Sequence, residues 1–247
     1  MTVSCFTDEA NSAHQQAAAA RLVATDVCAV IAAKQEAPSI GGIIRRAQPF
    51  VGDIVVVLGR STDGTGEIAA SHGARVIPDG GRGKGEALRC AISQIRTPIT
   101  VFIDADGSHD PEDIPLLVAP ITRGEADHVT ASRLRGGSSE LHGGFDEFFR
   151  LTGSSFITAC INWRFECRLS DSQNGFRAIR TSVLRELDLR EDGTTIEQEM
   201  IMKTLKRGWK MGEVPSHEHP RAHGASHINV WRCAPRYGYS LVKYLFF

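Results

Sequence analysis

The sequence predicts an α/β fold in which a mainly parallel, twisted sheet carries helices on both faces. The first observation is that short apolar runs alternate with helix-like segments, without an obvious linker or internal repeat. The second is that these runs end in Gly, Asp or Pro, which is typical of buried parallel strands. The third is size, because 247 residues with 42% hydrophobic content suit one large α/β domain or two small ones.

Each expected element follows from its local pattern. Apolar runs predict strands at residues 27–33, 53–58, 74–77, 99–103, 127–133 and 210–215. Apolar residues at helical spacing, with caps, predict helices at residues 39–47, 63–72, 85–95, 111–121, 145–163 and 195–207, and from residue 235 to the end. Residues 169–180 are too polar in the middle for a plain strand, and residues 136–144 read as a loop.

Composition excludes several classes of protein. A net charge of -1 and a pI near 6.8 give no overall field for nucleic acid. The six cysteines have neither CxxC nor zinc spacing, which indicates reduced thiols in a cytoplasmic protein. Asp8 and Glu9 argue against a signal peptide, and no apolar stretch has the roughly 20 residues that a membrane span needs. We therefore expect a protein that is soluble or peripheral at the cytoplasmic membrane face.

Two carboxylates stand at the end of the strand expected at residues 99–103. Asp104 and Asp106 leave the sheet at its carboxyl edge, where open α/β sheets bind ligands. Because crowded carboxylates repel each other, a divalent cation such as Mg2+ or Mn2+, shared with substrate phosphates, is one explanation. The alternative is a polar turn in which Asp110 caps the helix that begins at Pro111.

A glycine-rich turn, Gly80-Gly-Arg-Gly-Lys-Gly85, precedes the helix expected at residues 85–95. Glycines let a backbone approach a phosphate, a helix amino end supplies donors, and Arg82 and Lys84 supply charge. Without Ser or Thr after the lysine it is not a Walker loop, and alone it is weak evidence. Ser61-Thr-Asp-Gly-Thr65 is explained by a turn and a helix cap.

Taken together, the motifs resemble those of inverting family 2 glycosyltransferases of GT-A fold, over residues 27–232. The early motifs are Val30-Ile-Ala-Ala-Lys-Gln-Glu36, Ser61-Thr-Asp-Gly-Thr65, Gly83-Lys-Gly85, Asp104-Ala-Asp-Gly-Ser108 and Ala131-Ser-Arg133. Later motifs resemble the dolichol-phosphate mannosyltransferase branch: Asp171-Ser-Gln-Asn-Gly-Phe-Arg177, Glu197-Gln-Glu-Met200, Glu213-Val-Pro215 and Arg221-Ala-His-Gly-Ala-Ser226.

The resemblance implies a division of the chain. A single GT-A domain would span residues 25–232, with a Rossmann-like nucleotide-sugar half at 25–110 and an acceptor half at 111–232. Residues 1–24, rich in Ala and Gln, read as an N-terminal helical extension, and residues 233–247 as a C-terminal amphipathic tail.

The resemblance also implies roles for individual residues. The metal would be held by Asp104 and Asp106, with Ser108 near its shell. Asp106, Arg133 and Arg221 would be catalytic. The donor would contact Ala32, Lys34, Glu36, Leu58, Arg60, Arg82, Lys84, Asp104 and Ala105. The acceptor phosphate would lie near Arg150, Asn174, Arg177, Ser226 and His227.

The activity that the resemblance implies is metal-dependent, inverting transfer of a hexose from a GDP- or UDP-sugar to a polyprenyl phosphate. A lipid phosphate needs no strong base, and Glu199 is the fallback base if the acceptor is a hydroxyl. A second hypothesis is a small soluble acceptor, as in glucosyl-3-phosphoglycerate synthases. A third is a catalytically weak nucleotide-binding protein, because Lys34 and Leu58 stand where the family usually has other residues.

Two C-terminal features leave alternatives open. Tyr237, Leu241, Tyr244 and Leu245 fall on one side of the expected tail helix, which suits a membrane interface. The alternative is a helix docked on its own core or on a second subunit, so a homo-oligomer is a further option. Four histidines at 217, 219, 223 and 227 fit no common zinc spacing, and phosphate-loop residues are the favoured interpretation.

Overall fold

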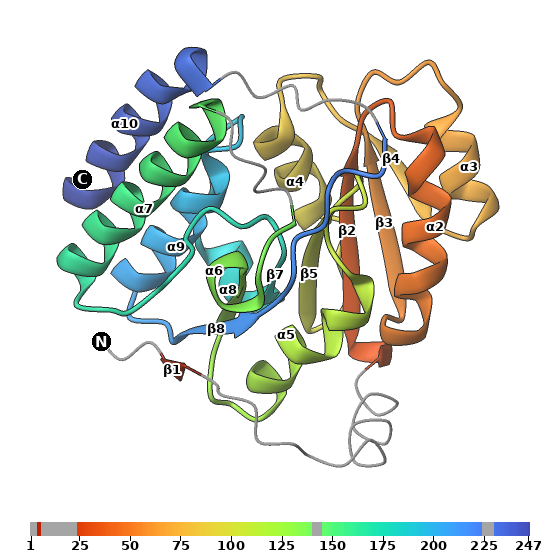
Figure 1. Ribbon diagram of the computed structural model, residues 1–247. Helices are drawn as coiled ribbons and strands as arrows, with labels where there is room; N and C mark the ends of the chain where they lie inside the picture. The colour runs from red at the N-terminus through yellow and green to blue at the C-terminus, as the bar shows by residue number, and fades with distance from the viewer. Residues whose placement is uncertain (1–3, 6–23, 140–144, 224–229) are drawn as a thin grey trace.

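Short apolar segments form a sheet in the computed structural model, which describes residues 4–5, 24–139, 145–223 and 230–247 (Figure 1). In these ranges the sheet has eight strands in the order β1-β8-β6-β7-β5-β2-β3-β4. The strands are β1 (Ser4–Cys5), β2 (Val27–Ala33), β3 (Asp53–Leu58), β4 (Arg75–Pro78), β5 (Ile99–Asp104), β6 (His128–Ser132), β7 (Arg177–Arg180) and β8 (Met211–Pro215). All neighbouring pairs are parallel except those of β7, which runs antiparallel to β5 and β6. The predicted α/β fold with a mainly parallel sheet is confirmed.

Helices cover both faces of the sheet (Figure 1). They are α2 (Ala37–Ala47), α3 (Thr65–Ser71), α4 (Lys84–Ile92), α5 (Ile114–Thr122), α6 (Arg133–Gly136), α7 (Phe145–Phe165), α8 (Thr181–Glu186), α9 (Ile196–Lys206) and α10 (Val230–Phe246), with 3-10 turns η1 (Ala24–Asp26), η2 (Gln48–Phe50) and η3 (Pro111–Asp113). Strand β2 shows why two layers are needed, because its side chains alternate between two cores. Val27, Ala29 and Ile31 pack with residues of α2 and α5. Cys28 and Val30 pack with residues of α4 and α8.

A third apolar cluster joins α7, α9 and α10 beside the sheet (Figure 1). The cluster buries Leu241, Tyr244 and Leu245, and Tyr237 packs against it. These four residues are the stripe that the sequence offered for a membrane interface. Instead, these residues pack α10 against the protein's own core, as the alternative interpretation of the tail helix expected. Among the described helices none combines the length and the apolar character needed to cross a bilayer.

Three local features differ from the sequence-based expectation. The polar segment at residues 169–180 ends in strand β7, because the charge of Arg180 is neutralised by Asp127, whose Oδ1 lies 3.1 Å from its Nε. The helix expected at residue 111 begins as the 3-10 turn η3, which Asp110 caps by accepting the Glu112 amide hydrogen. Ser4–Cys5 form a strand parallel to β8. Residues 1–3 and 6–23 of the expected N-terminal extension lie outside the described residues, and Ala24 belongs to η1.

Candidate active site

The carboxyl ends of the parallel strands bring the predicted site residues to one edge of the sheet. In the register of the sheet, Ala32 of β2 pairs with Asp104 of β5, and Ala33 pairs with Leu58 of β3. Strand β6 runs in the same direction as β5, since β7 is antiparallel to both, so Arg133 emerges at this edge too. Such an edge is where open α/β sheets bind ligands.

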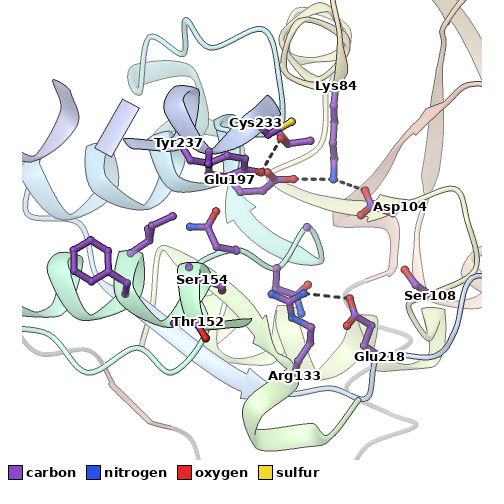
Figure 2. A pocket seen from close by; sticks show the side chains of 18 of the residues that line it. Lys84, Asp104, Ser108, Arg133, Thr152, Ser154, Glu197, Glu218, Cys233 and Tyr237 are labelled. Carbon is purple, nitrogen blue, oxygen red and sulfur yellow. Dashed lines mark hydrogen bonds and ion pairs between the residues drawn. The ribbon is translucent and has the colours of Figure 1, made fainter. Parts of the chain in front are cut away.

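Two adjoining cavities open at this edge. The larger has a volume of about 610 Å³ and lies between the sheet edge and helices α7 and α10 (Figure 2). The smaller, of about 310 Å³, lies over the ends of β2 and β3. Both are lined by Lys84, Asp104, Asp106, Thr194 and Arg221, which therefore form the boundary between them. This arrangement suits a reaction between two substrates that meet at the two aspartates.

Asp104 forms an ion pair with a partly buried lysine. The Nζ atom of Lys84 lies 2.5 Å from Oδ1 of Asp104 and 2.8 Å from Oε1 of Glu197 (Figure 2). On the other side, Nε2 of His109 lies 3.6 Å from Oδ2 of Asp104. Burial disfavours the carboxylate, but Lys84 and His109 outweigh it and lower the pKa of Asp104. Burial also disfavours the ammonium, yet Asp104 and Glu197 raise the pKa of Lys84, so the pair is charged at neutral pH.

Asp106 is bound by its own turn and by a distant loop. The amide and hydroxyl of Ser108 donate to its Oδ1 at 3.0 and 2.7 Å. The guanidinium of Arg221 places one nitrogen 3.0 Å from Oδ2 of Asp106 and another 2.8 Å from Oε1 of Glu36. The amide of Ala222 donates to the Asp106 carbonyl at 2.9 Å. Arg221 and Ala222, in the described part of the loop after β8, are thereby held against Asp106, and Ser108 supports Asp106.

Arg133 faces the larger cavity from the start of α6. Its Nε and one terminal nitrogen donate to the two oxygens of Asp171 at 2.7 and 3.0 Å, a bidentate arrangement. Another nitrogen lies 3.4 Å from Oε1 of Glu218 (Figure 2). Burial opposes ionisation of Asp171, but Arg133 outweighs it and lowers the pKa of Asp171. A fixed cation therefore borders the larger cavity.

At the α4 amino end, the protein itself already occupies two of the amides that were expected to be donors for a phosphate. The carbonyl of Asp192 accepts from the amides of Gly85 and Glu86 at 2.8 and 3.2 Å. The Glu86 carboxylate accepts from the Gly80 amide at 2.8 Å. Gly85 is required here because a Cβ at this position would collide with the Glu191 carbonyl. Only Lys84 of this turn is left to face both cavities with a charge.

Most of the predicted donor residues line the smaller cavity: Ala32, Lys34, Glu36, Arg60, Lys84, Asp104 and Ala105. Leu58 and Arg82 do not line it. The Leu58 side chain packs against Gly66 at the start of α3. Arg82 is solvent-exposed and lies 3.6 Å from Glu86. The sequence could not separate them from their neighbours, because strand alternation and turn geometry decide which side chain faces the cavity.

Only some of the predicted acceptor residues are found to line a cavity. Asn174 lines the larger cavity. Arg177 is 1% exposed and lines neither cavity, because its guanidinium is buried and donates to the backbone carbonyls of Glu197 and Asn174. Arg150 belongs to α7, but its side chain lies outside the described residues, as do Ser226 and His227 entirely.

The structure adds residues to which the sequence assigned no role in the site. Glu197, Thr194 and Tyr237 line the larger cavity, and the Tyr237 hydroxyl donates to Thr194 Oγ1 at 2.7 Å. Glu197 was visible within a motif, but Glu199 of the same motif was the fallback candidate for a base. Glu199 is fully buried, lines neither cavity and accepts from the amides of Arg190 and Glu191 at 2.8 Å. Two glutamates two positions apart on a helix face different directions, and the sequence does not tell which one faces the cavity.

The two aspartates suit a metal ion that shares its ligands with a substrate. Their carboxylates are hard oxygen ligands that reach both cavities. Within the described residues no group of three or more His, Cys, Asp or Glu side chains is placed to hold a metal. His217 and His219 contact each other edge to face, at 4.7 Å between ring centroids, and His223 is exposed. The donor set therefore fits Mg2+ or Mn2+ completed by phosphate oxygens.

Residues 28–188 match the family described as Glycosyl transferase family 2. Glycosyltransferase AglJ of Haloferax volcanii is 31% identical over 202 residues, which cover 81% of this chain and 65% of AglJ. The hexosyltransferase Agl6 of the same organism, named for low-salt glycan biosynthesis, is 33% identical over 167 residues, 68% of this chain and 40% of Agl6. The chain thus spans 65% and 40% of the length of these two relatives.

A dolichyl-phosphate hexose transferase of H. volcanii is 28% identical over 225 residues, 88% of this chain and 93% of the relative.

Solved structures of glucosyl-3-phosphoglycerate synthase from Mycobacterium tuberculosis have the same fold. The complex with Mn2+, UDP and glucosyl-3-phosphoglycerate has a TM-score of 0.74 at 21% identity, covering 98% of this chain and 88% of that one. The complex with Mg2+ and UDP has a TM-score of 0.75 at 23% identity, covering 98% and 86%. This likeness confirms the GT-A-type fold expected from the sequence.

Proposed function

The chain belongs to glycosyltransferase family 2, and from this premise we propose that it transfers a hexose from a nucleotide sugar to a polyprenyl phosphate. The proposed reaction is one direct displacement that inverts the anomeric carbon. Mg2+ or Mn2+ is the proposed cofactor. Within the domain, residues 25–110 are proposed to bind the nucleotide sugar and residues 111–232 to supply most of the acceptor side.

The donor proposal is supported by the charges around the smaller cavity. Lys34, Arg60, Lys84 and Arg221 line it together with the two aspartates. Cations in this number suit the two phosphates of a nucleoside diphosphate. The mycobacterial synthase of the same fold was crystallised with UDP and with Mn2+ or Mg2+.

The metal is proposed to bind Asp104 and Asp106 together with oxygens of the donor diphosphate. Bound there, such an ion stabilises the negative charge that develops on a departing nucleoside diphosphate. Lys84 and Arg221 contact the same two carboxylates, so their charges lie beside the leaving group as well. The residues of the chain thus supply both the ligands for the ion and two further cations.

The observation that carries the acceptor proposal is the two-sided lining of the larger cavity. Arg133 and Lys84 line one part of it (Figure 2). Apolar side chains of α7 and α10 line another part, among them Phe156, Ile157 and Leu241. A polyprenyl phosphate has the same two parts, an anionic head and an apolar chain. The name of the dolichyl-phosphate hexose transferase relative agrees with such an acceptor.

The proposed chemistry needs little acid-base catalysis. A polyprenyl phosphate is an anion at neutral pH, so its oxygen can attack the anomeric carbon directly. A bond forms between this oxygen and the anomeric carbon, while the bond from that carbon to the diphosphate oxygen breaks. The electron pair of the broken bond leaves with the nucleoside diphosphate. Arg133, oriented by Asp171, is proposed to bind the acceptor phosphate and to reduce its repulsion with the donor.

Membrane contact is proposed through the exposed face of α7 and α10, not through the stripe that docks α10. Tyr239, Val242 and Phe246 are exposed and follow the spacing of one helical face. Phe156 and Trp163, seven positions apart on the neighbouring α7, are exposed as well. Exposed aromatic and aliphatic side chains on adjacent helices suit the interface of a bilayer, where a polyprenyl phosphate resides.

A small soluble phosphorylated acceptor is the second candidate function. The fold likeness to glucosyl-3-phosphoglycerate synthase, which covers 98% of this chain, favours it. Arg133 would suit the phosphate of either acceptor. The two candidates differ in the apolar part of the larger cavity, which a small hydrophilic acceptor does not use.

One experiment tests both candidates. Purified protein would be incubated with GDP-mannose, UDP-glucose or UDP-N-acetylglucosamine, with Mn2+, and with either a short polyprenyl phosphate or 3-phosphoglycerate. Release of nucleoside diphosphate and the formed product would be measured. We expect turnover with the polyprenyl phosphate, and loss of about 100-fold or more in the Asp104→Asn, Asp106→Asn double variant.

Other outcomes select other functions. Turnover with 3-phosphoglycerate alone would replace the lipid acceptor by the soluble one. Metal-dependent nucleotide binding without turnover on any acceptor would support the catalytically weak nucleotide-binding protein. Full activity of the double variant would overturn the metal role of the aspartates.

A further inference from the structure

Each of the two aspartates shares a cation with a second carboxylate. Lys84 bridges Asp104, at 2.5 Å, and Glu197, at 2.8 Å. Arg221 bridges Asp106, at 3.0 Å, and Glu36, at 2.8 Å. The second carboxylates come from distant parts of the chain, Glu36 just before α2 and Glu197 in the first turn of α9. The same three-part arrangement thus occurs twice at the boundary between the two cavities.

A divalent ion bound to Asp104 and Asp106 would compete with these two cations. The ion and the Lys84 ammonium both require the oxygens of Asp104. Lys84 is largely shielded from solvent, and a buried ammonium without a counter-charge is strongly disfavoured. Release of Asp104 to a metal is therefore costly unless another anion keeps the ammonium. Glu197 already lies within ion-pair distance and meets this need.

The surroundings leave Lys84 few other positions. Gly175 packs so closely that an added Cβ would lie 2.7 Å from Oδ2 of Asp104 and 2.8 Å from Nζ of Lys84. The backbone carbonyl of Glu197 accepts from the buried Arg177 guanidinium at 2.9 Å, which fixes the first turn of α9. The nearest second anion for Lys84 is thus held in place by the fold.

We infer that Glu197 and Glu36 are positioning residues that retain Lys84 and Arg221 when a divalent ion binds Asp104 and Asp106. The inference rests on the metal role in the proposed function. In this arrangement the two carboxylates set the affinity for the ion, since they stabilise the displaced cations. They also keep both cations beside the donor diphosphate.

The test measures binding of Mn2+ alone, by the electron paramagnetic resonance signal of free Mn2+, to four proteins. These are the wild type, Glu197→Gln, Lys84→Met and the double variant. We expect Glu197→Gln to raise the Kd for Mn2+ by about tenfold, because Lys84 then has only Asp104 as a partner. In the Lys84→Met background the same change should have no effect. Lys84→Met alone should bind Mn2+ at least as tightly as the wild type.

Glu199→Gln is the matched control. Glu199 is on the same helix, is buried and pairs with Lys203 at 2.7 Å, but it does not contact Lys84. It should leave the Kd for Mn2+ unchanged. Glu36→Gln, measured with and without Arg221→Met, repeats the experiment on the second bridge. Circular dichroism in the presence of EDTA checks that each variant is folded.

The outcomes separate this inference from the proposed function. A wild type that binds no Mn2+, or binds it equally well after Asp104→Asn and Asp106→Asn, overturns the metal role itself. A wild type that binds Mn2+ while Glu197→Gln has an unchanged Kd overturns the inference alone. The inference is also overturned if Glu197→Gln weakens Mn2+ binding equally in the wild type and in the Lys84→Met background, because Glu197 then acts only through the structure. If Glu197→Gln does not fold, weaker Mn2+ binding by Lys84→Met contradicts the inference.

Discussion

The carbonyl oxygen of Asp192 lies 2.8 Å from the amide nitrogen of Gly85, so a loop of the protein caps the amino end of α4. The sequence suggested a phosphate at this position. The same loop carries Thr194, which lines both cavities and accepts the hydroxyl hydrogen of Tyr237 on α10. The loop therefore connects α10, which lines the larger cavity, to Lys84, the first residue of α4.

We expect Gly85→Ala to destabilise the protein, because there is no room for a methyl group between α4 and this loop. The Cβ would collide with the Glu191 carbonyl and would lie 2.8 Å from the Gly193 carbonyl oxygen. Such overpacking against backbone lowers the free energy of unfolding by about 1–3 kcal/mol. Urea denaturation followed by circular dichroism at neutral pH measures the change.

Gly42→Ala is the control for this prediction. Gly42 lies inside α2, and an added Cβ would have no atom within 4 Å. Since alanine favours a helix interior over glycine, this change should raise the free energy of unfolding by about 0.5–1 kcal/mol. If Gly85→Ala were as stable as Gly42→Ala, the close packing of the loop on α4 would be wrong.

We expect Asp171→Asn to impair transfer, because Arg133 would lose its bidentate partner. Asp171 is 2% exposed and accepts from two nitrogens of Arg133. An amide offers only one acceptor oxygen, so the guanidinium would be less well oriented toward the acceptor phosphate. We expect kcat/KM for the acceptor to fall by about tenfold, with donor binding unchanged. A fall in donor affinity alone would contradict this role.

The same ion pair predicts a pH dependence of stability. Burial opposes ionisation of Asp171, but Arg133 outweighs it, so the folded-state pKa lies below the unfolded value of about 3.9. The contribution of the charged pair is then fully present above about pH 4 and is lost as the pH falls through the folded pKa. The stability difference between the wild type and Asp171→Asn should be constant from about pH 8 to pH 5 and shrink below about pH 4. A difference that grows on acidification would contradict the prediction.

Much of the fold was predictable because each strand is marked by a pattern within its own short stretch of sequence. Strands buried on both faces need unbroken apolar runs, and the runs at β2 and β3 gave their bounds correctly. Asp104 and Asp106 were recognisable because they directly follow such a run. Strand β7 was missed because one of its arginines, Arg180, is paired with Asp127, a residue far away in the sequence.

The site was less predictable where the direction of a side chain decides its role. Arg177 and Arg133 are both arginines in matching motifs, but one is buried beneath the site and the other lines the cavity. The cap that Asp192 places on α4 joins segments more than a hundred residues apart, and no local pattern records it. The ion pairs of Lys84 with Glu197 and of Arg221 with Glu36 also join distant segments, so no local pattern predicts them.

We expect Glu199→Gln to lower stability without removing catalysis. Its carboxylate accepts from two backbone amides and from the Tyr244 hydroxyl, and it pairs with Lys203. Loss of these charge-assisted contacts should lower the free energy of unfolding by about 1–3 kcal/mol. Because Glu199 lines neither cavity, kcat per folded protein should stay within about twofold. A loss of about 100-fold in kcat with normal stability would instead identify Glu199 as the general base.

We expect Tyr239→Glu together with Val242→Glu to weaken membrane contact. Both side chains are exposed on α10 and line neither cavity, so the change places charges on the proposed interface only. Flotation with vesicles containing polyprenyl phosphate should decrease by about tenfold or more, while transfer to a short, dispersed polyprenyl phosphate stays unchanged. Leu116→Glu, at an exposed leucine of α5, is the control and should float like the wild type. Equal flotation of all three proteins would show that this face of α10 does not contact the membrane.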